Sequence, residues 1–199
     1  LNDLKPCTFL CLELFLNCMK DQIIANKILN WYDINKRSLP WRKKVSNRKK
    51  QYYTLVSEFM LQQTQVLTVI PYFKRFVKKI PNFKKLSKTN DQTLMKLWEG
   101  LGYYSRAKNL KKSAIMINSK FGGILPSNFE DLKSLPGIGD YTSTAIMAIA
   151  FNQKFIPLDG NVERILKRVL YLRNEKDISK ENMQISKNFF GLSERASDY

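Results

Sequence analysis

A turn with the sequence "LPGIG", residues 135–139, separates two segments with helical patterns, and it constrains the fold more than any other feature. Pro136 cannot continue the first helix because it has no backbone N–H, while Gly137 and Gly139 allow backbone conformations that other residues resist. A second helix is expected to begin near Asp140, with its first amides pointing outward from the positive end of the helix dipole. A phosphate could approach such a turn closely. The stretch therefore predicts a helical hairpin that holds the DNA backbone without reading its sequence, although a simple helix–helix turn would look similar.

Helical patterns separated by short Gly, Pro, Ser or Asn stretches recur along the rest of the chain. No segment shows the alternation of apolar and polar residues that marks a strand between hairpin turns. We expect Thr64 to cap a helix that continues to Ile80, with a kink or a junction at Pro71. Asn90 or Asp91 is expected to cap the next helix. These patterns predict an all-α fold, arranged as a compact helical bundle.

The charge of the chain favours a polyanionic partner. Lys and Arg outnumber Asp and Glu by 34 to 17, which gives a net charge of +17. Nucleic acid is the usual partner of so basic a protein, although a lysine-rich coding bias would give the same charge. No apolar run approaches the roughly 18 residues that cross a bilayer, so we expect no membrane partner. The three cysteines, Cys7, Cys11 and Cys18, are clustered and odd in number, which argues against a disulfide framework.

Two carboxyl side chains stand in unusual surroundings. Glu58 interrupts the apolar spacing of "YYTLVSEFML" and is followed almost at once by two glutamines. Asp159 lies between the apolar segment "FIPL" and Gly160, just before a helical pattern. A helical Glu that faces solvent and an Asp that caps a helix are the ordinary explanations. The residues alone leave both explanations open.

Five sequence blocks together carry a resemblance to a known family. Their order is "LPWR" (39–42), "SEFMLQQTQV" (57–66), "WEGLGYYSRAKNL" (98–110), "LPGIG" (135–139) and "LDGNV" (158–162). The combination resembles adenine DNA glycosylases of the MutY type, within the endonuclease III-like, helix-hairpin-helix DNA glycosylase superfamily. The likeness runs from about Met19 to the last residue.

The resemblance implies hydrolysis of the N-glycosidic bond of adenine mispaired with oxoguanine or guanine, leaving an abasic site. It assigns Glu58 as the acid that protonates adenine N7, which requires an apolar pocket to keep the carboxyl protonated near neutral pH. It assigns Asp159 as the carboxylate that stabilises the cationic sugar, with Asn161 fixing its loop. Lyase-competent relatives have a lysine where this chain has Tyr141, which cannot form a Schiff base. We therefore expect a monofunctional enzyme in which Tyr141 contacts Asp159 or the lesion phosphate.

Further residues are assigned to DNA and base contacts by the same resemblance. A base must leave the duplex before an enzyme can act on it, and Gln63 and Tyr103 are the expected wedges. Tyr104, in contrast, is expected to pack in the core. The other residues assigned to DNA binding are Gln62, Thr64, Gly137, Ile138 and Gly139. The residues assigned to the adenine pocket are Arg37, Leu39, Trp41, Arg42 and Leu61.

The expected organisation follows the helix-hairpin-helix glycosylase fold. Residues 1–18 form an extension, residues 19–46 an N-terminal helix and basic loop, and residues 47–154 a six-helix barrel with the hairpin at 130–151. Residues 155–199 hold the Asp loop and begin a second helical domain. Relatives bind a [4Fe–4S] cluster through C-x6-C-x2-C-x5-C and add a Nudix-like domain. Because that cysteine pattern does not occur in this sequence, we expect a truncated chain without cluster ligands.

The expected partner is double-stranded DNA with an adenine mispair, bound by a monomeric, cytoplasmic protein that is associated with the nucleoid. A non-catalytic helix-hairpin-helix remnant that only binds DNA is the alternative outside the enzyme class. Within the enzyme class, an endonuclease III-like lyase is disfavoured by Glu58 and Tyr141. Thymine-mismatch glycosylases also carry a tyrosine at this position, so Tyr141 alone leaves the base open.

Overall fold

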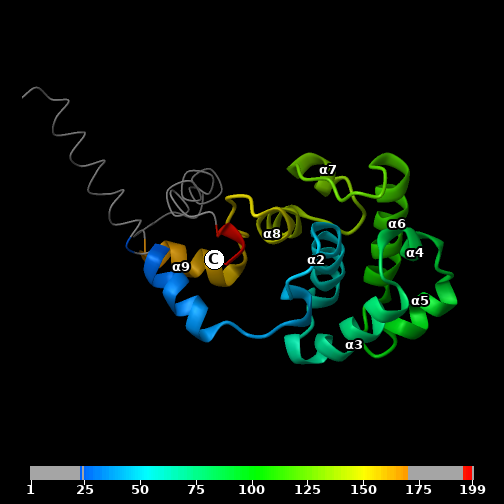
Figure 1. The fold of residues 1–199 in the computed structure, drawn as a ribbon, viewed down its shortest axis with the longest axis horizontal. Helices are drawn as coiled ribbons and strands as arrows, with labels where there is room; N and C mark the ends of the chain where they lie inside the picture. The colour runs from blue at the N-terminus through cyan, green and yellow to red at the C-terminus, as the bar shows by residue number, and fades with distance from the viewer. Residues whose placement is uncertain (1–22, 24, 170–194, 199) are drawn as a thin grey trace, which may run out of the picture. The chain divides into compact units, whose positions relative to one another are not determined.

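The computed structural model describes residues 23, 25–169 and 195–198, which belong to two compact units (Figure 1). The central unit comprises residues 37–151, and the terminal unit combines residues up to 36 with those from 152 onward. Throughout the described ranges the regular secondary structure is helical, which confirms the predicted all-α class. The central unit includes the basic loop that the sequence analysis grouped with the N-terminal helix. The extension at 1–18 and residues 170–194 of the expected second helical domain lie outside the described residues.

The helices of the central unit are short and follow one another closely. They are η1 (Pro40–Arg42), α2 (Asn47–Leu61), α3 (Val66–Lys79), α4 (Phe83–Lys88), α5 (Asp91–Trp98), α6 (Tyr104–Lys120), α7 (Phe129–Lys133) and α8 (Asp140–Phe151). The terminal unit contains a helix at residues 25–35, α9 (Gly160–Val169) and η2 (Ala196–Asp198).

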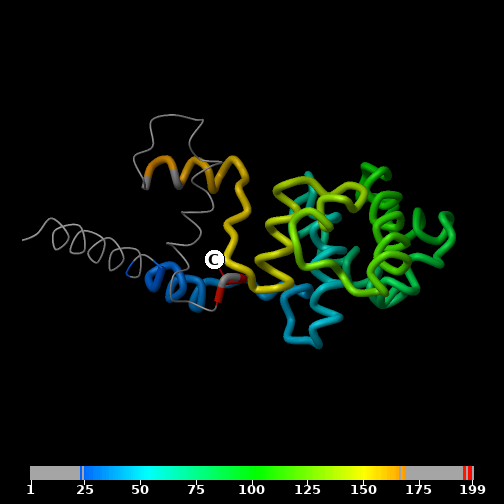
Figure 2. The backbone as a smooth tube through the Cα atoms, turned by 90° about the horizontal axis from the view of Figure 1, so that it is seen from above, coloured from blue at the N-terminus to red at the C-terminus, as the bar shows by residue number. Residues whose placement is uncertain are grey.

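Helix α2 is the centre of the central unit. It contacts η1, α3, α6 and α8, and α8 lies beside it in both views (Figures 1 and 2). Leu55, Val56, Phe59 and Met60 on α2 have no solvent exposure. A helix that is buried on several sides is held by packing rather than by its own propensity. Any functional group on α2 is therefore fixed in place by the core.

The predicted caps were partly correct. The Asn90 side chain accepts a hydrogen bond from the amide of Thr93 at 2.8 Å and begins α5, as predicted. Thr64 does not cap α3, however, because Gln65 occupies the N-cap position and makes no capping bond with its side chain. Helix α3 also continues through Pro71 instead of forming a junction there. Pro71 is the sixth residue of α3, so its missing N–H leaves one carbonyl of the first turn without a helical donor, and burial of Val69 and Phe73 on either side of it supports the continuous helix.

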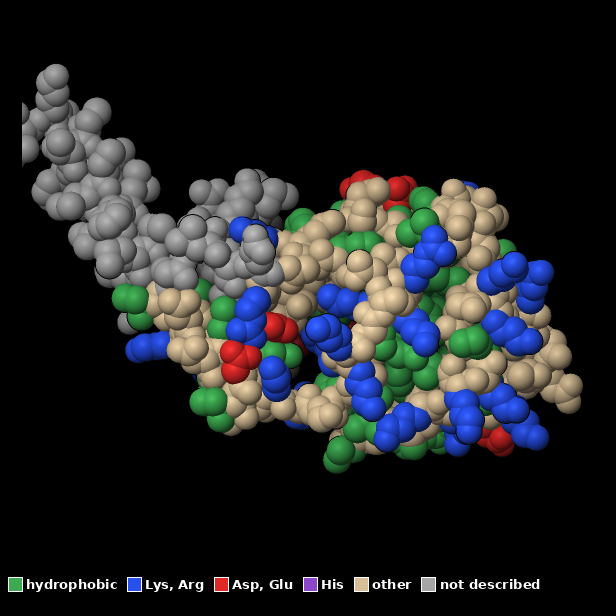
Figure 3. Space-filling model, in the orientation of Figure 1, with side chains coloured by type: hydrophobic (Ala, Val, Ile, Leu, Met, Phe, Trp, Pro, Cys, Tyr) green, Lys and Arg blue, Asp and Glu red, His purple; other side chains and the backbone are tan. Residues whose placement is uncertain are grey.

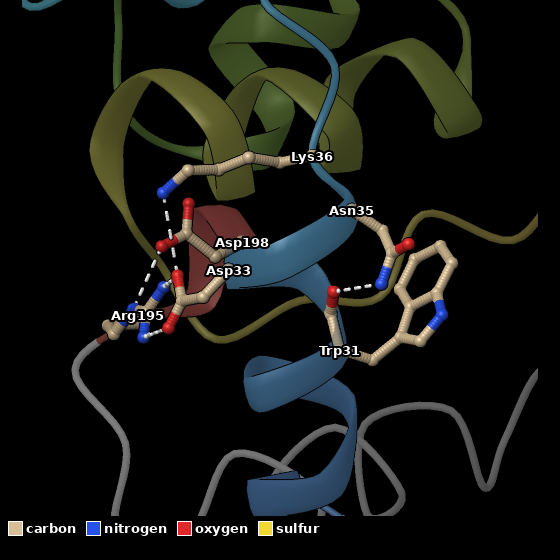
Figure 4. A network of polar contacts seen from close by, with 6 residues as sticks. All are labelled: Trp31, Asp33, Asn35, Lys36, Arg195 and Asp198. Carbon is tan, nitrogen blue, oxygen red and sulfur yellow. Dashed lines mark hydrogen bonds and ion pairs between the residues drawn. The ribbon is translucent and has the colours of Figure 1, made fainter.

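In the terminal unit, an ion-pair network joins segments that are distant in sequence (Figure 4). Arg195 donates to both carboxyl oxygens of Asp33, at 2.6 and 2.9 Å, and its Nε donates to Asp198 at 2.9 Å. This bidentate contact holds the pKa of Asp33 below its usual value. The amide of Ser197 also donates to Asn152 Oδ1 at 3.0 Å. Three parts of the chain are thereby tied together.

The surface of the central unit is strongly basic. In the orientation of Figure 3, Lys and Arg side chains gather along the lower and right-hand parts of this unit, where Figure 1 shows α3, α5 and α6. Between residues 66 and 120 the only acidic residues are Asp91 and Glu99. None of the helices in the described part of the chain is long and apolar enough to span a membrane.

Candidate active site

Glu58 lies in the last turn of α2 and is only partly accessible to solvent. Burial raises the pKa of Glu58 to about 7, and the nearby positive charge of Arg42 acts in the opposite direction. Desolvation penalises the charged form of a carboxyl, so the neutral acid persists to higher pH. Glu58 therefore keeps far more of its acid form at neutral pH than a solvated carboxyl would.

The apolar residues that stand beside Glu58 in the sequence of α2 are buried. Leu55, Phe59 and Met60 are fully buried, and they flank Glu58 on the same helix. Glu58 keeps its place through its backbone, since its carbonyl accepts a hydrogen bond from the amide of Gln62. A carboxyl on such a buried helix can keep its proton near neutral pH.

The α7–α8 hairpin packs directly against the helix that carries Glu58. Gly137 has a φ of +82°, and a Cβ atom there would lie 2.9 Å from Phe59 and from Asn109. The Gly137 carbonyl also accepts a hydrogen bond from Gln62 Nε2 at 3.3 Å. Gly139, in contrast, has open space where a Cβ would be. Only Gly137 is therefore required by packing, and the surface above Gly139 is free for a ligand.

Other contacts fix the hairpin within the central unit. Ser113 Oγ donates to the Pro136 carbonyl at 2.8 Å, and Ile138 is buried. Lys133 Nζ lies 2.7 Å from Asp140 Oδ1, and this contact raises the pKa of Lys133. Gln62 and Ile138, which the resemblance assigned to DNA binding, thus also serve internal packing.

Two turns near Glu58 present exposed side chains from a strained backbone. Gln63 has a φ of 56° and Tyr103 a φ of 48°, values that residues other than Gly rarely adopt. The side chain of Gln63 is exposed, and Tyr103 is 61% exposed. Strain of this kind is concentrated at functional sites. Tyr104 is also exposed, at 45%, so the prediction that it packs in the core was wrong; its place at the start of α6 leaves it on the surface.

In the terminal unit, Asp159 caps α9. Its Oδ1 accepts hydrogen bonds from the amides of Asn161 and Val162, at 2.9 and 2.8 Å. Asn161 Nδ2 also donates to Asp159 Oδ2 at 3.4 Å, and Asn161 Oδ1 accepts from Arg164. Both amides belong to the first turn of α9, so the carboxyl of Asp159 is held at the start of this helix. Because Asp159 and Glu58 belong to different units, their pairing across one site stays a prediction.

The remaining predicted site residues are distributed as follows. Tyr141 lies in the first turn of α8 and is 46% exposed; its expected contact with Asp159 would join the two units and stays a prediction. Arg37 and Arg42 are exposed, and Leu39 and Leu61 are half-buried. Trp41 is only 5% exposed.

The ring of Trp41 packs edge-on against Phe73 at 5.3 Å. Trp41 is therefore part of the core, and little of its ring is available for stacking on a base.

A cavity of about 630 Å³ lies between α3 and α5, apart from these residues. Its lining contains none of the predicted pocket residues and consists of Tyr72, Arg75, Lys79, Thr93, Lys96, Leu97 and Glu99. It is therefore distinct from the adenine pocket that the resemblance implies.

No cluster of His, Cys, Asp and Glu that could hold a metal ion occurs in the described ranges. The three cysteines lie outside those ranges, and their spacing differs from the four-cysteine pattern. The described residues therefore do not fit a [4Fe–4S] cluster.

Arg106 is the residue of this region that the sequence analysis missed. It is 7% exposed, and its guanidinium donates to backbone carbonyls of both turns that carry Gln63 and Tyr103. The string "YYSRAKNL" gave no signal for this, because an Arg in a helical pattern normally faces solvent.

Comparison with known proteins places these features in a family. Residues 56–189 match the family model of the HhH-GPD superfamily base excision DNA repair protein. The chain is 43% identical over 164 residues to the adenine DNA glycosylase of Buchnera aphidicola subsp. Baizongia pistaciae, covering 81% of this chain and 46% of that protein. It is 46% identical over 162 residues to the adenine DNA glycosylase of Rattus norvegicus, covering 79% and 31%. The chain thus spans less than half the length of these relatives.

Solved structures support the same assignment. A thermostable thymine-DNA glycosylase superposes with a TM-score of 0.77 at 26% identity, covering 90% of this chain and 83% of that chain. An endonuclease III in a DNA complex superposes with a TM-score of 0.69 at 19% identity, covering 91% and 83%, which shows a shared fold. The region matched by the family model contains Glu58, the hairpin and the Asp159 cap. The chain therefore belongs to the HhH-GPD superfamily of base excision DNA repair proteins.

Proposed function

We propose that this protein is a monofunctional adenine DNA glycosylase, which removes adenine paired with oxoguanine or guanine from double-stranded DNA. The observation that carries the proposal is Glu58, a carboxyl on a buried helix with its pKa raised to about 7. The identity to adenine DNA glycosylases supports the choice of adenine. The protein would act on chromosomal DNA at the nucleoid, as a monomer.

In this mechanism Glu58 supplies the proton that lets adenine leave. Adenine without a proton departs as an anion and is a poor leaving group, whereas protonation at N7 makes it a neutral one. A solvated carboxyl would be almost fully ionised at pH 7 and could not serve. The buried position of Glu58 keeps a useful fraction of the acid form.

Asp159 would stabilise the sugar cation that is left behind. An ionised carboxylate, held by two helix-start amides, provides a fixed negative charge for an oxocarbenium-like state. Water then adds to the sugar and leaves an abasic site. Tyr141 has no amine to attack the sugar, so the DNA strand stays intact.

The reaction itself is the test of this function. Full-length protein is incubated with duplex DNA that contains adenine opposite oxoguanine, and with matched duplexes that contain thymine opposite guanine. We expect release of adenine only, with strand cleavage appearing only after alkali treatment. Release of thymine would favour the thymine-mismatch alternative. The structural similarity to a thymine-DNA glycosylase is the reason to test for it. Cleavage without alkali would indicate a lyase, and retardation of DNA with no base release would indicate a binding protein.

The pH dependence of adenine release should follow the protonation of Glu58. Since the acid form is required and its pKa is about 7, the single-turnover rate should fall about tenfold per pH unit well above pH 7. The rate is measured from pH 5.5 to 9 with protein in saturating excess at constant ionic strength. A rate that rises between pH 7 and 9 would contradict the role of Glu58 as an acid.

Asp159→Asn separates the charge of this residue from its capping role. Asn caps a helix about as well as Asp, so the melting temperature should stay within about 2 °C of the wild type. Loss of the negative charge should lower the rate of adenine release by about 10²-fold. Thermal melting and single-turnover kinetics provide the two measurements. Equal rates in the variant and the wild type would remove Asp159 from the mechanism.

A further inference from the structure

Arg106 makes an unusual set of contacts within the central unit. Its Nη1 donates to the carbonyls of Phe59 (3.2 Å), Met60 (3.0 Å) and Gln62, and to Thr64 Oγ1 at 3.2 Å. Since Nη1 has two hydrogens, these four contacts are shared between them. All four acceptors lie at the end of α2 or in the turn that follows it, next to Glu58.

The other terminal nitrogen of Arg106 contacts the second turn. Nη2 donates to the carbonyls of Leu101 (3.1 Å) and Gly102 (3.2 Å), just before Tyr103. The guanidinium also lies over the rings of Trp98 and Tyr103, with centroid distances of 5.8 and 5.3 Å. One planar cation thus joins two turns that are about forty residues apart in the sequence.

No carboxylate of the described residues lies within ion-pair distance of the Arg106 guanidinium. Its charge is instead stabilised by backbone carbonyls, several of them from the negative end of α2, whose last carbonyls lack intrahelical donors. Burial lowers the pKa of Arg106, which nevertheless stays fully charged because arginine is so strong a base. A buried charge that is balanced by backbone carbonyls, one hydroxyl and two aromatic rings, without a carboxylate, is costly, and simple packing would not require it.

The turns joined by Arg106 carry Gln63 and Tyr103, each with a left-handed backbone and an exposed side chain. Core packing does not explain this conformation, because neither side chain enters the core. We propose that Arg106 is a positioning residue, which holds Gln63 and Tyr103 in one rigid arrangement so that both enter the DNA stack together beside the extruded adenine. The proposal rests on the proposed glycosylase function and adds to it a residue that touches neither base nor sugar.

Lysine cannot replace Arg106 in this role. Its single ammonium is a point donor and cannot reach both turns at once, although it keeps the positive charge. Arg106→Lys should therefore impair opening of the duplex more than it impairs cleavage of the glycosidic bond. Arg75→Lys is the matched control: Arg75 also lies over an aromatic ring, that of Tyr72 at 4.7 Å, but it is exposed on α3 and contacts neither turn.

The first measurement reads duplex opening without cleavage. The full-length protein is titrated into a duplex with 2-aminopurine beside a 2′-fluoro adenosine opposite oxoguanine, in which the glycosidic bond resists hydrolysis. Fluorescence rises when the stack opens. At saturating protein, Arg106→Lys should reduce the opening equilibrium about tenfold, while Arg75→Lys should match the wild type. Wild-type opening by Arg106→Lys would overturn the proposal.

The second measurement separates positioning from a general structural role. Adenine release is compared between adenine opposite oxoguanine and adenine opposite a tetrahydrofuran abasic analogue, where no base pair must be broken. Arg106→Lys should lower the ratio of these two rates about tenfold, because extrusion of an unpaired base needs less help from the wedges. An equal loss on both substrates would indicate a merely structural residue. Wild-type protein that opens the duplex but releases no adenine would contradict the proposed function and leave the positioning role standing.

Two further tests address the link between Arg106 and the turn at residues 62–64, and the first of them does not require an Arg106→Lys protein that folds. Thr64→Val keeps Arg106 and the side-chain volume but removes one acceptor, and should reduce opening about two- to threefold. The effects of Gln63→Ala and Arg106→Lys on duplex opening should be non-additive. The double variant should open DNA as well as the more impaired of the two single variants. Full additivity, or wild-type opening by Thr64→Val, would refute the link between Arg106 and the turn at residues 62–64.

Discussion

Glu58→Gln is expected to lower the single-turnover rate of adenine release by about 10³-fold or more, since it replaces the proposed general acid by a group without an acidic proton. The side chain keeps its size, so DNA binding should not change. Rates are measured with the full-length protein on duplexes with adenine opposite oxoguanine. Glu99→Gln, a change of the same kind at an exposed position of the central unit, should retain the wild-type rate. Release at the wild-type rate by Glu58→Gln would refute the assignment of the acid.

The same substitution should make the protein more stable at alkaline pH. Because the folded-state pKa of Glu58 is raised from 4.5 to about 7, its favourable contribution is complete below about pH 4.5 and is lost as the pH rises through 7. At pH 8 the ionised carboxyl lowers the free energy of unfolding by up to about 3 kcal/mol, which the neutral amide avoids.

Melting curves measure this effect directly. At pH 4.5 the melting temperature of Glu58→Gln should equal that of the wild type. At pH 8 it should be higher by about 5 °C or more. A difference that does not depend on pH would indicate a hydrated carboxyl. A gain in stability together with a loss of activity would show that Glu58 is retained for its chemistry rather than for the fold.

Gly137→Ala is expected to destabilise the central unit strongly. The new methyl group would meet Phe59 and Asn109 at 2.9 Å in a backbone with a φ of +82°. Strain and overpacking together should lower the free energy of unfolding by about 2–4 kcal/mol. Since Phe59 follows Glu58 on α2, adenine release should also fall. Chemical denaturation of the two proteins measures the effect, and an unchanged midpoint would contradict the packing described for the hairpin.

Gly139→Ala is the matched variant two residues away. No atom lies within 4 Å of the added methyl group, so the free energy of unfolding should change by less than about 0.5 kcal/mol. A methyl group would nevertheless stand where a DNA phosphate approaches the backbone, and we expect affinity for duplex DNA to fall about tenfold. Fluorescence anisotropy at constant salt measures this affinity. Unchanged affinity would indicate that the phosphate contact lies elsewhere on the protein.

Local chemistry explains which parts of the fold could be predicted from the sequence. Pro136 and Gly137 interrupt a helix, and Asn90 caps one through a nearby amide. Both features depend only on a few neighbouring residues. The continuation of α3 through Pro71 depends on the burial of Val69 and Phe73, which is a tertiary effect. Trp41 was expected to be available to a base, but its packing against Phe73 depends on a tertiary contact that no local pattern reveals.

The candidate site divides in the same way. The sequence identified Glu58 as unusual because a carboxyl interrupts an apolar helix, and its raised pKa agrees with that expectation. Arg106 could not be identified, because its acceptors at Phe59 and Gln62 lie more than forty residues earlier in the chain. Its role depends on two turns meeting in space.

The contact between Asp33 and Arg195 has a consequence for synthesis on the ribosome. These partners are 162 residues apart, and their unit cannot be completed until translation has passed the second of them. Residues 37–151 form a continuous stretch and can fold while the rest is still being made. The nascent chain would therefore present a folded α2 and hairpin while Asp33 still waits for its partner, Arg195, to be made.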